Sequence, residues 1–448
     1  MRLKLLTLAL TLAAVSLPSH GEDLMDAYRQ ARANDPVLAQ ADAQRASTHE
    51  GIDQARSALL PQISASGQFS QSSSGGSFNA GLQGDGSGHT RSRDLSASLT
   101  QSVFNLNQIA NLRAAHSSAD AQDEVYAAAE QDLYVRVATA YFNVLTAEDQ
   151  LSYAKANEDA FKQQYEQADQ RFKVGLSAIT DVYQAKSYYE GAKAQTLTAQ
   201  NALDDAREAL TQITGQPVGD LKKLRDDLPM KAPTPADPTA WVQQALQSNP
   251  NVLSQQYNVA AAEHSVNAAR ANHLPTLSAS LSRGKTNTWP EYGPIDHDQA
   301  AAAGLGRYGT TIGLTLTVPI FSGGYTQSTV RQSIDQREAA KDALESQRRQ
   351  VKRDTLNYYR SVLAGISQVQ SGKAAVESGE KALDATRAGF QVGTQTMTDV
   401  LLAIQTLTSA ESTYSQNRHQ FILDKLLLKQ AAGTASLKDI ETINALLQ

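Results

Sequence analysis

Apolar and small residues recur at alternating steps of three and four over two long stretches of the chain, residues 144–172 and 362–390. This is the heptad period of a coiled-coil helix. In the second stretch, Gly365, Gly372 and Gly379 occupy one heptad position. Glycine costs about 1 kcal/mol relative to alanine inside a helix. The three glycines therefore indicate a neighbouring helix that needs the room, and the alternative is a weak or broken helix.

Proline breaks helix interiors, and it is absent between Pro61 and Pro217 and after Pro319. Within these runs the sequence predicts two nearly unbroken helices, over residues 105–172 and 325–390. At 1.5 Å per residue each would reach roughly 100 Å, about three times the hydrocarbon thickness of a bilayer. Helices of this length need other helices to pack against.

Before each long helix the hydrophobic period changes from 3.6 to 2. Apolar and small residues alternate with polar ones in four segments, at residues 63–69, 95–103, 277–281 and 312–318. We expect four strands of roughly nine to eleven residues, the length of a tilted membrane strand. Two long polar connections, residues 72–92 and 284–309, are predicted to be loops on one side of the resulting hairpins.

Four strands cannot close a barrel, and an open sheet edge in lipid leaves backbone groups unpaired. Other copies must therefore supply strands. Two copies would give eight strands around a filled interior, whereas three give twelve and room for an aqueous pore. The predicted fold is mainly α with a membrane β-barrel: a long α-helical coiled-coil tunnel plus four β-strands per chain, with a 12-stranded barrel shared by a trimer.

The chain also contains a long internal repeat. An offset of 218 holds without a gap from Phe172 and Phe390 to Gly215 and Gly433, and the openings of the two halves match at an offset of 214. We expect a first structural repeat over residues 22–215, made of a helix, a β-hairpin, a long helix and a return helix. A linker over residues 216–239 then leads to a second repeat over residues 240–433 and a C-terminal segment over residues 434–448.

Residues 1–21 have the pattern of a secretory signal peptide. Arg2 and Lys4 precede an apolar run over residues 5–17, and a small residue, Gly21, ends the segment. The run is shorter than the ~18 residues of a membrane-spanning helix. Removing the two cations takes the net charge from -6 to -8, which argues against nucleic acid as a partner. The chain has no cysteine, so a lipid-modified cysteine is excluded.

The sequence offers no signature of an enzyme, a metal site or a cofactor site. The eight histidines are scattered: His264 and His273 are nine apart, and His49-Glu50 lacks the second histidine of a zinc helix. There is no Gly-x-Ser-x-Gly elbow and no phosphate-binding glycine loop. We therefore expect no catalytic residues, no metal and no cofactor.

The chain resembles the TolC family of outer-membrane channel-tunnel proteins over essentially its whole mature length. The resemblance rests on the Leu-Pro-x-Leu/Ile-x-Ala entry to each hairpin, on Val103-Phe104 and Pro319-Ile320-Phe321 at the hairpin ends, and on two Phe-x-Val-Gly motifs. It implies an outer-membrane location with the tunnel in the periplasm, and places residues 216–239 and 434–448 at the tunnel's equator. It also implies a trimeric exit duct for drugs or secreted polypeptides, which a periplasmic adaptor docks to an inner-membrane transporter.

The two Phe-x-Val-Gly motifs begin the stretches RFKVGLSAITDV and GFQVGTQTMTDV at corresponding places. Glycine is the usual residue where a helix reverses. We expect the chain to turn here, at the far end of the tube from the membrane. The predicted adaptor-docking turns consist of Val174, Gly175, Leu176, Val392, Gly393 and Thr394.

By resemblance, Asp399 lines the periplasmic constriction, and Asp181, preceded by Thr180, accepts hydrogen bonds that keep the entrance shut. The alternative for each aspartate is an ordinary one, a carboxylate at the positive end of a helix dipole. We expect the entrance to involve six residues: Asp399, Leu402, Asp181, Thr180, Gln395 and Phe390.

The sequence departs from the family pattern at three of these positions. Members with a well-described lock have tyrosine and arginine where this chain has Phe390 and Gln395, and a second acidic residue where it has Leu402. Phenylalanine cannot donate a hydrogen bond, and glutamine replaces a charged donor. The lock is thus predicted to be weaker or differently built. Leu402 could form an apolar ring that gates by dewetting, or could simply pack in the coiled coil.

The main rival interpretation is a trimeric coiled-coil surface protein or adhesin whose barrel only anchors it. That architecture predicts one long stalk with a single anchor at one terminus. Here both strand pairs lie inside the repeat, and each is followed by a helix that leaves and returns. This arrangement favours the channel.

Overall fold

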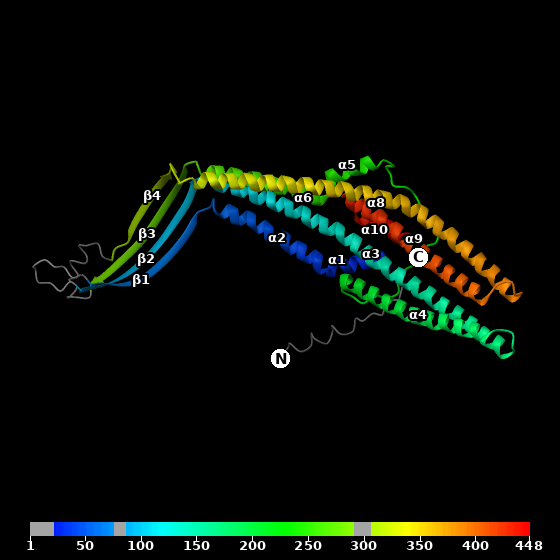
Figure 1. Cartoon of the computed structure of the whole chain (residues 1–448). Helices are drawn as coiled ribbons and strands as arrows, with labels where there is room; N and C mark the ends of the chain where they lie inside the picture. The colour runs from blue at the N-terminus through cyan, green and yellow to red at the C-terminus, as the bar shows by residue number, and fades with distance from the viewer. Residues whose placement is uncertain (1–21, 76–86, 291–305) are drawn as a thin grey trace, which may run out of the picture. The chain divides into compact units, whose positions relative to one another are not determined.

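The computed structural model describes residues 22–75, 87–290 and 306–448. The predicted signal peptide and parts of both polar connections, residues 76–86 and 291–305, lie outside the described residues. The chain divides into two compact units, and Figure 1 labels the helices and strands. The helical unit contains the described residues up to Ala43, with Glu124–Leu253 and Gln347–Gln448, and the strand unit contains Gln44–Asp123 and Ser254–Ser346.

Two very long helices run through both units and confirm the predicted ones. Helix α3 (Leu106–Lys173) has 68 residues and α8 (Tyr325–Gln391) has 67. Each is followed by a return helix about half as long, α4 (Ile179–Thr214) and α9 (Met397–Ala431). Within the described ranges, no helix combines the length and the apolar character needed to cross a membrane.

Three glycines of α8, at one heptad position, lie against the return helix α9, which confirms the predicted close neighbour. A Cβ added at any of the three would lie 3.2 or 3.3 Å from a side-chain atom of α9. The contacts pair Gly365 with Phe421, Gly372 with Tyr414, and Gly379 with Leu407. Helix α8 is therefore unbroken, and its glycines permit a close helix approach.

Shorter helices repeat in the two halves. They are α1 (Leu24–Asn34) and α2 (Pro36–Ser57) in the first half and α5 (Pro238–Ser248) and α6 (Pro250–Ala271) in the second. A separate helix, α10 (Leu437–Asn444), lies near the C-terminus. In each half an 11-residue helix ends at one polar residue, and a proline then begins a 22-residue helix. The break falls there because proline fits the first turn of a helix but not its interior.

The main core of the helical unit surrounds Tyr141 and Phe142 of α3, both fully buried. The Tyr141 hydroxyl lies within hydrogen-bonding distance of the carbonyl oxygens of Glu22 (3.1 Å) and Lys222 (2.9 Å). One buried side chain thus ties the start of the described chain and the 216–239 segment to the long helix.

The four strands form one antiparallel sheet in the order β1-β2-β3-β4. They are β1 (Gln62–Gly75), β2 (Ser87–Phe104), β3 (Thr276–Pro290) and β4 (Gly309–Thr317). The predicted length of nine to eleven residues is right for β4, with 9, and wrong for the others, with 14, 18 and 15. Residues 72–75, 87–92 and 284–290, predicted to be loop, are strand because backbone pairing continues through them.

The two faces of the sheet differ sharply in polarity. One row across the sheet is Ile63, Leu99, Leu281 and Ile312, and the next row, on the opposite face, is Ser64, Ser98, Ser282 and Thr311. Hydroxyl groups on the polar face bond across strands, as in the 2.9 Å contact of Ser64 with Ser98. In a single chain the apolar face is uncovered, with Ile63 76% and Ile312 81% exposed.

Basic residues border this apolar face along a diagonal. On β3 the apolar side chains give way to basic ones between Leu281 and Arg283. On β2 they do so between Leu95 and Arg93, and Arg93 pairs with a β3 residue four positions beyond Arg283. The Arg283 guanidinium lies 5.5 Å from the ring centroid of Tyr308. Because barrel strands are tilted, a band level with the membrane crosses the strands obliquely.

Candidate functional site

The first helix reversal is a Schellman motif built on Gly175. The N–H of Leu176 donates to the carbonyl of Arg171 (2.8 Å), and that of Gly175 donates to the carbonyl of Phe172 (2.9 Å). Gly175 has φ 76°, a left-handed conformation that side chains disfavour. Glycine and this hydrogen-bond pair therefore end α3 and start the turn toward α4.

The second reversal has the same construction 218 residues later. The N–H of Thr394 donates to the carbonyl of Gly389 (2.9 Å), and that of Gly393, with φ 82°, donates to the carbonyl of Phe390 (3.2 Å). The repeated Phe-x-Val-Gly sequence thus has a local structural cause. Phenylalanine is the second-last helical residue in each case, and glycine supplies the left-handed turn.

Three aliphatic side chains project into solvent from the two turns. Val174 is 68% exposed, Leu176 70% and Val392 76%. Thr394 is also exposed. Such exposure of large aliphatic groups leaves apolar area available to a partner surface.

Asp399 lies in the first turn of α9 and closes a capping box. Its Oδ2 accepts hydrogen bonds from the backbone N–H (2.8 Å) and the hydroxyl (2.7 Å) of Thr396. The Thr396 hydroxyl in turn lies 3.2 Å from the N–H of Asp399. These bonds favour the carboxylate and lower the pKa of Asp399. The aspartate is a helix cap within one chain, whatever it faces in an assembly.

Asp181 occupies the corresponding place in α4 with a different partner. Alanine, Ala178, stands at the N-cap position and provides no side-chain cap. The hydroxyl one residue earlier, on Ser177, donates to Asp181 Oδ2 (2.7 Å). Thr180, the residue before Asp181, is exposed. The two aspartates are therefore equivalent in position and unequal in bonding.

Phe390 and Gln395 lie beside groups other than Asp181. The Arg171 guanidinium stacks over the Phe390 ring, 4.8 Å from its centroid. Gln395 is exposed and packs on Gly389, where an added Cβ would lie 2.7 Å from the Gln395 side chain. Among the described contacts, the hydrogen bond to Asp181 comes from Ser177.

The ends of the two helix hairpins meet in a shared apolar cluster. Its members include Phe161, Val182, Leu383, Val400 and Leu401, drawn from α3, α4, α8 and α9. At its edge the Thr398 hydroxyl donates to Gln184 Oε1 (3.2 Å), which joins α9 to α4. Leu402, next to buried Leu401, points outward and is 56% exposed. Leu402 is therefore not packed within the chain.

Sequence reasoning missed Ser177, Thr396 and Arg171 as parts of this site. A threonine followed three residues later by an acidic residue is a helix-start signal, so Thr396 could have been found. Ser177 lies one residue outside that spacing. Arg171 contacts a ring 219 residues away along the chain, and a single sequence carries no signal for that contact.

The family model of outer membrane efflux proteins matches residues 27–216 and 241–434. The chain is 36% identical to outer membrane protein TolC of Vibrio cholerae, over 99% of this chain and 98% of that protein. It is 34% identical to outer membrane protein TolC of Escherichia coli, over 98% and 87%. It is 27% identical to the alkaline protease secretion protein AprF of Pseudomonas aeruginosa, over 94% and 86%.

Solved structures share the fold at lower identity. The outer membrane protein VceC of Vibrio cholerae superposes with a TM-score of 0.75 at 19% identity, over 92% of this chain and 96% of that one. CusC superposes with a TM-score of 0.77 at 20% identity, over 92% of each chain. The predicted fold class, outer-membrane location and non-enzymatic transport role agree with these relatives. The chain belongs to the outer membrane efflux protein family.

Proposed function

We propose that three copies of the chain form one continuous exit duct for drugs or secreted polypeptides. The sheet carries this proposal. Its order leaves β1 and β4 at the two edges of the described sheet, and one face is apolar and uncovered in the single chain. Pairing β4 of one copy with β1 of the next removes the edges, gives twelve strands, and turns the apolar faces to lipid and the hydroxyl faces to a lumen.

The cysteine-free sequence allows a direct test of this pairing. Ser66→Cys is combined in turn with a cysteine at Thr311, Gly313 or Thr315, all on the polar face, and the membranes are oxidised. We expect a covalent ladder that ends at the trimer for at least one combination.

The matched control is the double variant Ser64→Cys/Ser98→Cys, whose hydroxyls bond within one chain. It should form a disulfide without linking copies. If the control oxidises while every β1–β4 combination stays monomeric, the shared barrel is wrong.

We propose that the two turns dock a periplasmic adaptor, which connects the duct to an inner-membrane transporter. Exposed Val174, Leu176 and Val392 supply apolar contact area, and Gly175 and Gly393 set the shape of the loops. The docking surface would consist of these residues and Thr394. Energy for transport would come from the transporter, since the duct itself is passive.

Replacing Gly175 or Gly393 with valine tests the docking surface, because a β-branched side chain is strained at positive φ. We expect loss of adaptor cross-linking with normal barrel insertion. Gly51→Val is the control, since this helical glycine has negative φ and open space around it. Normal adaptor cross-linking by both turn variants would contradict the assignment.

We also propose that the entrance residues form a constriction at the periplasmic end of the tunnel. Three-fold symmetry would gather three copies of Asp399 around the axis, with Leu402 one helical turn along. Phe390 and Gln395 replace the usual donors to the region of Asp181 and Thr180, so the closed state would depend on apolar contacts and on the Arg171–Phe390 stack.

We further propose that residues 22–215 and 240–433 are the two structural repeats. Residues 216–239 join them, and residues 434–448 follow the second repeat.

A further inference from the structure

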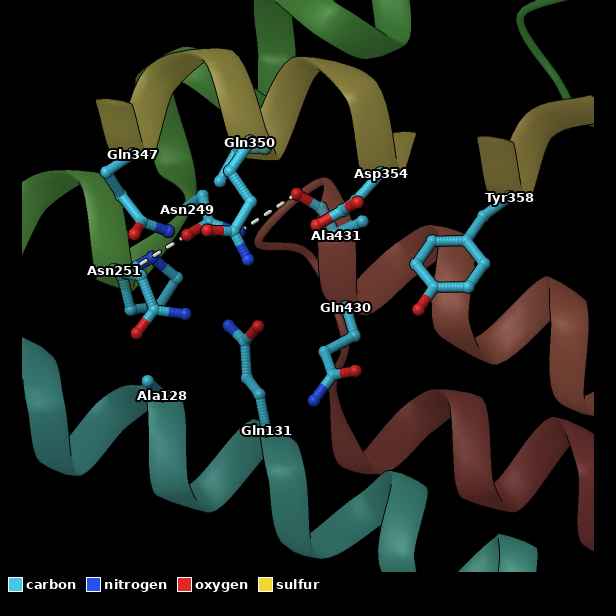
Figure 2. Close-up of a pocket in the computed structure, with 12 residues that line it drawn as sticks. Ala128, Gln131, Asn249, Asn251, Gln347, Gln350, Asp354, Tyr358, Gln430 and Ala431 are labelled. Carbon is cyan, nitrogen blue, oxygen red and sulfur yellow. Dashed lines mark hydrogen bonds between the residues drawn. The ribbon is translucent and has the colours of Figure 1, made fainter. Parts of the chain in front are cut away.

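A polar pocket of about 190 Å³ lies in the helical unit, where the break between α5 and α6 meets α3, α8 and the end of α9 (Figure 2). Side-chain amides dominate its lining, and the single carboxylate among the lining residues is Asp354. Figure 2 shows Gln350 and Asp354 extending from α8 toward Gln131 of α3 and Gln430 of α9. The pocket can therefore offer several oxygen acceptors to one small group.

The first half of the chain has an ion pair at the corresponding place. Asp35, between α1 and α2, has a side chain only 2% exposed. Arg136 of α3 binds it with two hydrogen bonds, of 3.0 and 2.7 Å, and its Nε donates to Asp132 (2.7 Å). The Arg136 guanidinium lowers the pKa of Asp35, so a buried carboxylate and a cation neutralise one another here.

In the second half the same backbone frame carries different charges. Asn249 replaces Asp35: each ends an 11-residue helix, bonds its N–H to the carbonyl four residues earlier, and precedes a proline. Asp354 replaces Arg136 at the offset of 218. A negative group therefore stands where the first half has its cation, and the space of the guanidinium is open.

Both polar atoms of the Asn249 side chain have hydrogen-bond partners. Asn249 donates through Nδ2 to the carbonyl of Ala431 (3.0 Å), and its Oδ1 accepts from the N–H of Asn251 (3.0 Å). An amide bonded in this way needs no counter-ion. The remaining charged group of the pocket lining is Asp354.

Among the residues that the structure describes, the ion-pair partner of Asp354 is its sequence neighbour Arg353, at 3.1 Å. The Arg353 side chain is 75% exposed, and exposed ion pairs contribute little because water screens them. On the inner side lies Tyr358, whose pKa is raised by burial and by the nearby carboxylates of Asp354 and Asp424. The Asp354 side chain is itself 33% exposed, so its carboxylate is accessible to a group bound in the pocket.

We propose that this pocket binds a small organic cation, a guanidinium or primary amine, whose N–H groups donate to Asp354 and to the surrounding amide oxygens. The volume suffices, since a cavity of about 150 Å³ holds a benzene-sized molecule. The bound cation occupies the place that the Arg136 side chain fills in the first half. This site is separate from the turns and from the proposed entrance, and does not depend on either assignment.

Ethylguanidinium is a suitable probe, with ethylurea as its neutral counterpart of the same shape. Saturation-transfer NMR on the intact protein in detergent should show saturable binding of ethylguanidinium and none of ethylurea. Equal binding of the two, or no saturable binding of ethylguanidinium, would overturn the proposal. This comparison needs no variant and so cannot fail through misfolding.

Two variants locate the site. Asp354→Asn should weaken ethylguanidinium binding at least tenfold, whereas Asp384→Asn, an equal charge change at an exposed position of α8, should leave it unchanged. The double variant Asn249→Asp/Asp354→Arg places the residue pair of the first half in the second half, and should abolish ethylguanidinium binding. Unchanged binding in Asp354→Asn would place the cation elsewhere and contradict the proposal.

Discussion

The glycines of α8 give the sharpest test of how the tunnel helices pack. At Gly365 an added Cβ would lie 3.2 Å from Cδ2 of Phe421, a side chain only 2% exposed. Phe421 therefore has little freedom to move away. At Gly191, in the return helix α4, an added Cβ would meet nothing within 4 Å. The two glycines share helical geometry and differ in their surroundings.

Replacing each glycine with alanine separates the gain in helix propensity from the cost of overpacking. In both helices alanine gains about 1 kcal/mol of helix propensity. At Gly365 the new methyl group also overpacks the contact with Phe421, which costs about 1 to 3 kcal/mol. Gly191→Ala should therefore be more stable than the parent protein by about 1 kcal/mol. Gly365→Ala should range from neutral to about 2 kcal/mol less stable.

Unfolding of the detergent-solubilised protein by guanidinium, followed by circular dichroism, measures the order of the midpoints. Gly379→Ala should fall between the two variants, because the atom it meets belongs to the flexible end of Leu407. Gly365→Leu should unfold earliest. If Gly365→Ala raised the midpoint as much as Gly191→Ala, close approach to α9 would not be the reason for the glycines.

Three further outcomes are expected. Asp399→Asn should lower the cation selectivity of the open channel, measured by reversal potentials in a salt gradient. Unchanged selectivity in this variant would mean that the carboxylate does not line the pore. Gln395→Arg should lower the conductance by supplying a charged donor at the proposed entrance. Burial lowers the pKa of His419 to about 4, below its usual 6.5. The unfolded chain therefore binds the proton more readily, and the stability of the fold should decrease as the pH drops from 6.5 toward 4. In thermal unfolding scans, His419→Gln should make this decrease smaller. Arg136→Gln leaves the buried carboxylate of Asp35 without its cation and should cost about 3 to 5 kcal/mol in unfolding experiments; a loss below 1 kcal/mol would contradict the role of this pair.

The long helices were predictable because several independent signals agree along them. Proline is absent, the heptad period persists, and glycine follows each helix, so α3 and α8 begin and end within one residue of the expected positions. The predicted lengths of β1, β2 and β3 were too short because the outer parts of these strands do not alternate apolar and polar residues. Ser72 and Arg91 fall in segments that look like loop, yet backbone pairing with β2 and β3 continues through them.

The turns were predictable and their surroundings were not. Gly175 and Gly393 each end a long helical pattern within the repeated Phe-x-Val-Gly motif, a place where glycine commonly ends a helix. The stack of Arg171 on Phe390 depends on how two distant helix ends come together, which local pattern does not encode. The exchange of Arg136 for Asp354 can be read from the offset of 218, whereas the pocket that Asp354 lines becomes visible only in the structure.

A shared barrel whose polar face surrounds a conducting lumen is the structural basis proposed for transport. Ser98 and Leu99 are adjacent on β2 and lie on opposite faces, so a cysteine at either position reports on one face. With purified protein in planar bilayers, we predict stable single-channel currents that a charged thiol reagent reduces in Ser98→Cys and leaves unchanged in Leu99→Cys. Trimers that insert without conducting, or a block at Leu99→Cys and none at Ser98→Cys, would contradict the account.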